Sequence, residues 1–531
     1  MPAVADLAGP PAVGIQAVRQ AMVAKPANNT CKGRMRSPGF IPRFHRSPAR
    51  RFGAEFAHCN TAVAKLHSCV GLFAAILMVI LPVAGLRASV HDYQVSISAD
   101  LRTVDVTARL DDADLRLRAP SGRVERLGSM QGCDGATVDT SGRTLRVRGG
   151  CLQYTTSLEP FRRSRSYGKQ SPRFAGHESW LWLPPLRTAD VVRLTLQLPK
   201  GVTAVVPWRS TGPGRFELQQ SPGSGEAIAW FGRVEQDTLV VQGAPLSLAL
   251  IDGSGGMRLN RFVIKPWLEE AAGLVATVGG TFPNRFAQVM VEPGEASLFG
   301  DSPVPFGHVI RSGEEVVRFF VQPGATGKAL REDWTAVHEF AHLLLPYVRE
   351  DQKWISEGFA SYYQNVLLAR GGIYSEKEAW QRLTRAFQSA AQGSHPPSPN
   401  DAHMRSFWEV RMLIYWSGAA IALMGDVELR RLSKGRESLD TVLGRLATCC
   451  LPSPDVWEGK ELFRRLDTLS GIAVFVPLYD KYANTPGMPD TRQLLQDLGI
   501  MASRKGIVID STAPFATHRA AIMRRLPRAA K

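Results

Sequence analysis

The sequence predicts a multidomain α+β protein, and three observations predict it. From Tyr93 to about Leu250, apolar and polar residues alternate between turn residues, which is typical of half-buried strands in an antiparallel β-sandwich. After about Gly256, a helix-like segment and several strand-like segments indicate a mixed α/β module. From about Ser375 onward the pattern is helical.

The length of 531 residues, with 44% hydrophobic and 21% charged residues, is enough for roughly three folded domains. We expect a leader, a β-sandwich domain, a mixed α/β domain and a C-terminal helical domain. Their predicted ranges are 1–88, 89–255, 256–390 and 391–531.

The leader combines a segment without periodicity and a short apolar run. Residues 1–60 are rich in Pro, Ala, Arg and Gly, which predicts disorder. Lys65 precedes the apolar run 70–81, and small residues follow as far as Ala88, which indicates a secretory signal peptide cleaved near that residue. The uncharged run 68–86 is also just long enough to span a bilayer, so a retained membrane anchor is the alternative. Both interpretations predict an exported protein, periplasmic or secreted.

The expected strands of the β-rich region include 93–98, 104–108, 192–198 and 227–231. Cys133 and Cys151 flank a predicted hairpin, and a disulfide between them fits an exported protein; two unpaired buried thiols are the alternative. Cys449 and Cys450 are adjacent, which is poor geometry for a mutual bond, and they lack zinc-ribbon spacing. We assign them no function.

The formal net charge of +16 does not indicate a nucleic-acid partner. Residues 1–88 carry +9 of it, which leaves a modest surplus on the rest of the chain. No platform of aromatic and basic residues accompanies that surplus.

The expected α/β module begins with a helix over 262–278 and strands over 287–291, 306–310 and 316–321. A helix over 333–345 follows, and Pro346 ends it. Further on, 375–378 is a capping box at a helix start, and 392–400 is a Gly/Pro/Ser loop.

The helix over 333–345 contains the sequence His-Glu-Phe-Ala-His. His338 and His342 are four residues apart, so both imidazoles project from one helix face and can share one tetrahedral metal ion. Glu339, next to the first ligand, can act as general base towards water. The other helix face is apolar, which argues against an accidental match.

A second helix over 354–363 carries Glu357, which can supply a third, oxygen ligand. A fourth position then stays open for water or substrate, as catalytic zinc requires. Two imidazoles and a carboxylate favour zinc, although cobalt, manganese or iron also accept these ligands. Glu378 and Asp426 are candidate acids to orient the histidines.

The segment 338–363 resembles gluzincin metallopeptidases, specifically the glycyl aminopeptidase family M61 and its M1 aminopeptidase relatives. The sequence Trp-Ile-Ser-Glu-Gly-Phe-Ala-Ser-Tyr-Tyr at 354–363 is close to the segment that carries that family's third zinc ligand. Further on, 415–420 resembles the family's Tyr-x-Lys-Gly-Ala motif, and 479–499 its closing segment.

The resemblance implies a thermolysin-like catalytic domain between a β-sandwich and a helical domain. It implies that His338, His342 and Glu357 bind zinc and that Glu339 is the base. It also implies that Tyr415 donates a hydrogen bond to the oxyanion formed at a peptide carbonyl. Without the resemblance, Tyr415 would be interpreted as a core or interface residue.

This chain departs from the family pattern in three places. Only fourteen residues separate His342 from Glu357, fewer than in typical relatives, and Ser417 replaces the lysine of the Tyr-x-Lys-Gly motif. The relatives carry a Gly-rich strand with a glutamate that holds the substrate's free amine, whereas the matching place near 305–309 has no acid. Cleavage at N-termini and internal cleavage therefore both stay open.

Together, these features predict a metallopeptidase that binds one zinc ion per chain and hydrolyses peptide or protein substrates. Two alternatives are another zinc hydrolase on the same scaffold and a non-catalytic, envelope-associated binding protein. The complete set of ligands and the intact Glu339 argue against the binding protein.

Overall fold

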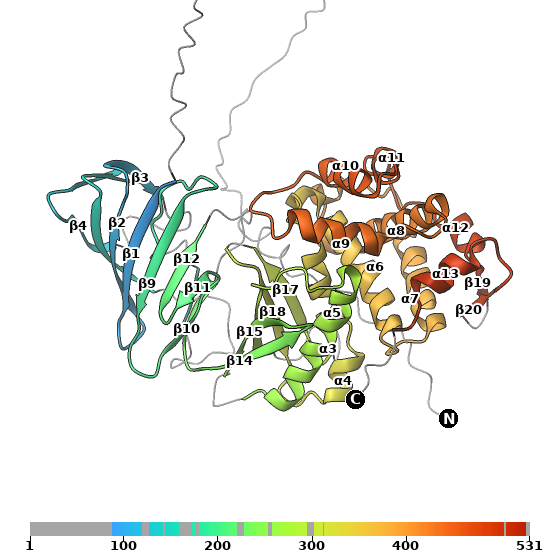
Figure 1. Cartoon of the computed structure of the whole chain (residues 1–531), viewed down its shortest axis with the longest axis horizontal. Helices are drawn as coiled ribbons and strands as arrows, with labels where there is room; N and C mark the ends of the chain where they lie inside the picture. The colour runs from blue at the N-terminus through green and yellow to red at the C-terminus, as the bar shows by residue number, and fades with distance from the viewer. Residues whose placement is uncertain are drawn as a thin grey trace, which may run out of the picture. The chain divides into compact units, whose positions relative to one another are not determined.

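The computed structural model describes residues 88–118, 127–141, 144–158, 173–176, 180–219, 228–252, 258–294, 302–311, 313–503 and 506–526 (Figure 1). The predicted disordered segment and the apolar run 68–86 lie outside the described residues.

The N-terminal part is β-rich, as predicted. Its largest sheet has the strand order β11-β12-β9-β1-β2-β7-β4. Two three-stranded sheets have the orders β10-β13-β8 and β3-β6-β5. The bounds are β1 Val90–Ile97, β2 Thr103–Arg109, β3 Asp114–Arg118, β4 Leu127–Gly132, β5 Thr137–Ser141, β6 Thr144–Arg148, β7 Cys151–Ser157, β8 Arg173–Gly176, β9 Val191–Gln197, β10 Thr203–Val205, β11 Arg209–Gly212, β12 Arg215–Leu218 and β13 Ile228–Gly232.

The predicted alternation is visible in the burial of these strands. In β1, Tyr93, Val95 and Ile97 are buried while the residues between them are exposed or half-buried. The expectation of a purely antiparallel arrangement was wrong, because β1 and β9 pair in parallel. The long chain segment between these two strands allows β9 to enter beside β1 in the same direction.

The predictions for the two cysteine pairs had different outcomes. Cys133 and Cys151 form the predicted disulfide, which joins the end of β4 to the start of β7. Cys449 and Cys450 also form a disulfide, so the expectation that these neighbours would not bond was wrong. The pair ends helix α9, where the chain leaves helical geometry and the two side chains can turn towards each other.

A mixed five-stranded sheet follows, with the order β14-β15-β16-β18-β17. Its strands are β14 Val234–Val241, β15 Ala244–Ile251, β16 Gln288–Pro293, β17 Phe306–Ile310 and β18 Val316–Val321. The first two strands come from the segment that the predicted boundary at residue 255 assigns to the β-rich region. Their apolar residues belong to the core that also contains α3 and α5, which explains the pairing.

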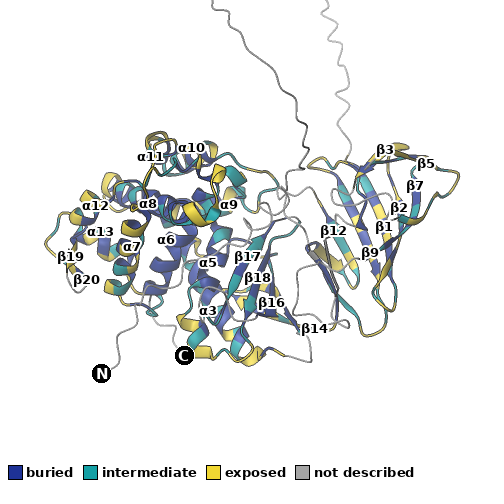
Figure 2. Ribbon diagram, turned by 180° about the vertical axis from the view of Figure 1, so that it is seen from behind, coloured by how far each residue is buried: buried dark blue, intermediate teal, exposed yellow. Residues whose placement is uncertain are grey.

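Helices pack against this sheet and continue to the C-terminus (Figures 1 and 2). Helix α3 lies against β14, and α5 lies against β17 and β18. The helices are α3 Arg261–Gly279, α4 Gly327–Glu332, α5 Thr335–Ala341, α6 Trp354–Arg370, α7 Glu376–Ala390, α8 Phe407–Ser433, α9 Leu439–Cys450, α10 Gly459–Ser470, α11 Phe475–Tyr482, α12 Arg492–Asp497 and α13 Ala516–Ile522. Short 3-10 turns lie at His342–Leu344, Glu350–Gln352 and Ala402–Met404, and a hairpin is formed by β19 Ile500–Ser503 and β20 Gly506–Ile509.

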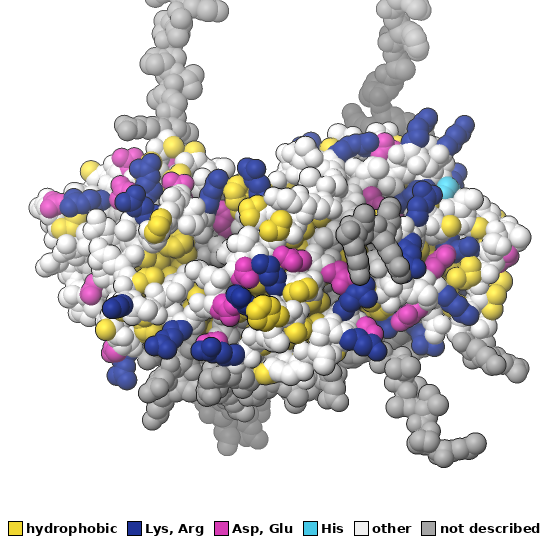
Figure 3. All heavy atoms as spheres, turned by 60° about the horizontal axis from the view of Figure 1, so that its bottom comes forward, with side chains coloured by type: hydrophobic (Ala, Val, Ile, Leu, Met, Phe, Trp, Pro, Cys, Tyr) yellow, Lys and Arg dark blue, Asp and Glu magenta, His cyan; other side chains and the backbone are white. Residues whose placement is uncertain are grey.

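Helix α8 is the centre of the helical part. It is long and apolar enough to cross a membrane, but 78% of its most apolar window is buried inside the protein, as in a core helix. Figure 2 shows α5 and α6 as mostly buried ribbons, while α7 presents an exposed face. On the face drawn in Figure 3, acidic, basic and apolar side chains are intermingled.

Candidate metal centre

Helix α5 presents the two histidines from within the core. Its first turn is held by Asp333, whose carboxylate accepts a hydrogen bond from the backbone N–H of Thr335 at 2.8 Å. The predicted single helix over 333–345 is α5 followed by the 3-10 turn at His342–Leu344, and the helical path ends before Pro346. His338 and Glu339 are both buried, with 2% and 7% of their surface exposed.

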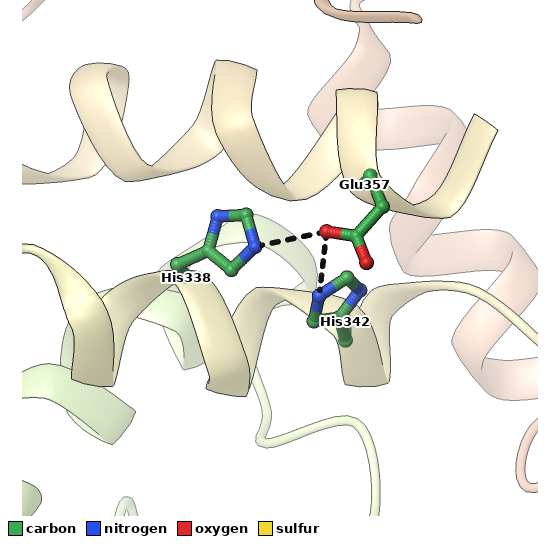
Figure 4. Close-up of side chains that lie close together, drawn as sticks. All are labelled: His338, His342 and Glu357. Atoms are coloured by element: carbon green, nitrogen blue, oxygen red, sulfur yellow. Dashed lines mark hydrogen bonds and ion pairs between the residues drawn. The ribbon is translucent and has the colours of Figure 1, made fainter. Parts of the chain in front are cut away.

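Helix α6 brings Glu357 to the histidines. Its Oε2 lies 3.3 Å from His338 Nε2 and 3.5 Å from His342 Nε2 (Figure 4). The fourteen-residue connection after His342 is therefore long enough to bring the third predicted ligand into place. The predicted ligands His338, His342 and Glu357 come together in one cluster.

The cluster fits a tetrahedral zinc ion. One ligand atom from each of the three residues lies within 4.8 Å of the others. Zinc bound at about 2.0–2.1 Å separates its ligand atoms by about 3.3 Å, close to the distances from Glu357 to both histidines. Two nitrogens and one oxygen leave a fourth position, as in catalytic zinc sites.

The electrostatics prepare the ligands for a cation. Burial lowers the pKa of His342 to about 3, so its imidazole is neutral and can donate a lone pair at neutral pH. Burial also raises the pKa of Glu339 to about 8, with a further contribution from the charge of Glu357. For Glu357, the neighbouring histidines outweigh the opposing effect of burial and lower the pKa. A positive ion at this position would favour the ionised form of both carboxylates.

Two neutral side chains of α6 orient the histidines. Gln364 Oε1 lies 2.8 Å from His338 Nδ1, and Ser356 Oγ lies 2.9 Å from His342 Nδ1. Both contacts leave the Nε2 atoms directed at Glu357. The sequence offered a signal that was missed, since Gln364 follows Glu357 by two helical turns and Ser356 directly precedes it.

The two acids considered for this orienting role lie elsewhere. Glu378 pairs with Arg382 on the exposed face of α7. Asp426 is buried beside Tyr362 and Arg430. Neither carboxylate is the hydrogen-bond partner of His338 or His342 within the described residues. This expectation was wrong because only acidic residues were candidates for it, whereas neutral side chains lie beside the Nδ1 atoms of the two histidines.

We expect Gln364→Leu to weaken zinc binding by about 10- to 100-fold, because His338 loses the group that fixes its ring. Gln364→Glu, which keeps an acceptor at the same place, should bind zinc within a few-fold of the unaltered chain. Competition with a fluorescent zinc chelator measures both. Equal affinities for the leucine variant and the unaltered chain would rule out the orienting role.

Tyr415 on α8 lies beside this cluster. Its ring centroid is 6.0 Å from that of His338, and only 4% of the residue is exposed. The structure therefore places the fifth predicted site residue next to the three predicted ligands, together with Phe407, whose ring centroid is 6.5 Å from that of Tyr415.

Strand β17 forms the edge of the mixed sheet beside Glu339. A Cβ atom on Gly307 would lie 2.7 Å from Glu339 Cγ, so glycine is required for this close approach. The described residues 302–311 contain no acid, as the sequence indicated. Glu315 forms an ion pair with Arg311, whose guanidinium also donates to the backbone carbonyl oxygens of His342 and Leu345.

Comparison with known proteins supports this description of the site. The model of the M61 glycyl aminopeptidase family matches residues 333–413, which include both histidines, Glu339 and Glu357. No curated protein matches the chain.

Among solved structures, an aminopeptidase N family protein from Idiomarina loihiensis is similar, with 15% identity, coverage of 77% of this chain and 78% of that chain, and a TM-score of 0.56. An M1 zinc metallopeptidase from Deinococcus radiodurans matches with 13% identity, coverage of 76% and 94%, and a TM-score of 0.47. The first of these likenesses shows a shared fold, a β-rich N-terminal region followed by a helical C-terminal part.

Proposed function

We propose that this chain, a gluzincin-type peptidase resembling the M61 and M1 families, hydrolyses peptide bonds with one zinc ion held by His338, His342 and Glu357. The observation that carries the proposal is the convergence of these three ligands beside Glu339 and Tyr415. Zinc at this position would polarise a carbonyl group and make water a stronger acid.

The residues of the chain have separate tasks in this reaction. Glu339 accepts the proton of the attacking water and then donates it to the leaving amine. Tyr415 donates its phenolic hydrogen to the oxygen of the attacked carbonyl, where negative charge develops. Gln364 and Ser356 hold the histidine rings so that their Nε2 atoms stay directed at the ion.

We further propose that the β-rich part is a sandwich and that the module around α5 and α6 is thermolysin-like. The two cores support this division: one apolar cluster contains the strands of the β-rich part, and another contains the mixed sheet and the helices.

The substrate would be a peptide or a protein, and its N-terminus need not be free. Relatives of this kind hold a free amine with a glutamate on the strand next to the active site. In this chain that strand, β17, has no acid among its described residues, and Glu315 is engaged by Arg311. Internal cleavage is therefore compatible with the site, alongside N-terminal trimming.

We also propose that the protein is exported, through a signal peptide or an anchor at residues 68–86. The disulfide between Cys133 and Cys151 supports an oxidising location. N-terminal sequencing of the protein from its natural source, with membrane fractionation, tests this. A mature N-terminus upstream of residue 60 in a soluble fraction contradicts both forms of the proposal.

The primary test is the metal content and peptide cleavage of the full chain beside the His342→Ala variant. We expect about one zinc per chain and cleavage of a mixed peptide library, both lost in the variant. Comparing free and N-acetylated peptides distinguishes trimming from internal cleavage. A chain that holds no zinc even after zinc is supplied, or that binds zinc and cleaves none of the peptides, overturns the proposal.

For Tyr415→Phe, we expect kcat to fall by about 10²- to 10³-fold while KM and zinc content stay close to those of the unaltered chain. The reason is that the phenylalanine ring keeps the packing against Phe407 but cannot donate a hydrogen bond to the developing oxyanion. Steady-state kinetics on one good peptide measures the change. An unchanged kcat would show that Tyr415 contributes to packing and not to the reaction.

A further inference from the structure

A polar cavity lies at the ends of α6 and α8 that are distant from the metal centre. It has a volume of about 520 Å³, and its lining includes Arg370 of α6, Arg430 of α8, Asp440 of α9 and His518 of α13. A water molecule takes about 30 Å³ in the liquid, so the cavity has room for a small polyatomic ligand together with water.

The charges around this cavity are mostly positive. Arg370, Arg430, Lys434 and Arg524 line it, against the single carboxylate of Asp440. Asp426 adds one more carboxylate through its ion pair with Arg430. Burial, together with Arg430, lowers the pKa of His518, so this histidine counts as neutral. Four cations against two carboxylates leave an excess of two positive charges.

Both carboxylates already contact neighbouring donors. Asp440 receives a hydrogen bond from Tyr363 at 2.9 Å and pairs with Arg370 at 2.9 Å. Asp426 accepts bonds from Tyr362 and from the backbone N–H of Leu439, besides pairing with Arg430. These contacts hold the two arginines in place.

The arginines are fixed and retain unused donors. Their side chains are only 7% and 10% exposed, and Arg370 Nε also donates to the carbonyl oxygen of Ile522. Each guanidinium carries five N–H groups, more than these contacts use. The exposed side chains of Lys434 and Arg524, also at this cavity, make no ion pair or hydrogen bond within the described residues.

We propose that this cavity binds a small multivalent oxyanion of the phosphate or sulfate class. Two preorganised guanidinium groups can donate paired hydrogen bonds to such an anion, and Lys434 and Arg524 can close over it. The hydroxyl group of Thr517 at the same cavity adds a neutral donor.

Binding would connect the two helices that carry the proposed catalytic residues. Arg370 is the last residue of α6, which carries Glu357, and Arg430 belongs to α8, which carries Tyr415. An anion bound to both guanidinium groups would hold the ends of these helices together and stabilise the folded chain.

The test is isothermal titration calorimetry of the full chain with inorganic phosphate at constant ionic strength. The double variant Lys434→Gln/Arg524→Gln removes two exposed charges from the cavity. The double variant Arg405→Gln/Arg464→Gln removes two exposed charges from residues that do not line the cavity and is the matched control. We expect saturable binding that weakens at least about tenfold in the first variant and stays unchanged in the control.

Phosphate can also bind to zinc, so the titration is repeated on chain depleted of metal. Binding that persists without metal supports the cavity, as does a melting temperature that rises with phosphate in the control but not in the cavity variant. Absence of saturable binding, loss of binding on metal removal, or equal weakening in both double variants overturns the proposal. None of these outcomes depends on peptidase activity.

Discussion

Glu339→Gln is expected to reduce peptide hydrolysis by about 10²- to 10⁴-fold while zinc stays bound at the level of the unaltered chain. An amide has the shape of the carboxylate but cannot accept the proton of the attacking water, so the general-base step is lost. The proposed zinc ligands are other residues, and His338, His342 and Glu357 are expected to keep their contacts. The measurement is kcat/KM on one peptide, with zinc content determined on the same sample.

The local structure makes unfolding a poor explanation for such a loss. Strand β17 approaches Glu339 closely at Gly307, and glutamine, which has the shape of glutamate, keeps this contact. Burial also raises the pKa of Glu339 to about 8, which means that the ionised carboxylate is costly there and that a neutral amide should not weaken the fold.

The matched control is Glu332→Gln, the same chemical change at an exposed residue at the end of α4. It should leave kcat/KM within about twofold of the unaltered value. Retention of activity by Glu339→Gln would show that another group removes the proton. Loss of activity together with loss of zinc would show that Glu339 supports the metal site and is not the base.

The convergence of the two histidines could be predicted from the sequence because their signal is local. A spacing of four residues fixes two histidines on one helix face, whatever the rest of the chain does. Predicting Glu357 required more information, because its distance from the histidines depends on how the connection after His342 folds. The motif at 354–363 supplied that information through its resemblance to a family, and the distances between Glu357 and the histidines agree with it.

The features that sequence reasoning missed depend on contacts between distant segments. The parallel pairing of β1 with β9 joins residues about a hundred positions apart, and alternation alone gives no strand direction. Likewise, β14 and β15 have the same alternation as the preceding strands, yet they join the mixed sheet. Gln364 was missed because a neutral amide in an apolar helix has no distinctive pattern, although its place on the Glu357 face could have indicated it.

Gly418→Ala is expected to destabilise the protein by about 1–3 kcal/mol or more and to reduce both zinc retention and activity. Helices α6 and α8 cross in close contact at Gly358 and Gly418. A Cβ atom on Gly418 would lie 2.0 Å from the carbonyl oxygen of Trp354 and 2.9 Å from Gly358 Cα. These are backbone atoms that cannot rotate away, so the helices would have to separate.

Separation at this crossing would disturb the site from both sides. Trp354 lies three residues before Glu357 on α6, and Tyr415 lies three residues before Gly418 on α8. The crossing therefore sets the distance between the third metal ligand and the proposed oxyanion donor. Urea unfolding, zinc content and kcat of the variant measure the stability and the chemistry separately.

Gly273→Ala is the matched control, because Gly273 lies inside helix α3 and a Cβ atom there would meet nothing within 4 Å. That substitution should stabilise the helix by about 0.4–1 kcal/mol. If Gly418→Ala behaved like Gly273→Ala, the close crossing would not be what positions Glu357 and Tyr415. The opposite signs expected for one chemical change at two helical glycines follow from packing, since the helix-forming preference of alanine is the same at both positions.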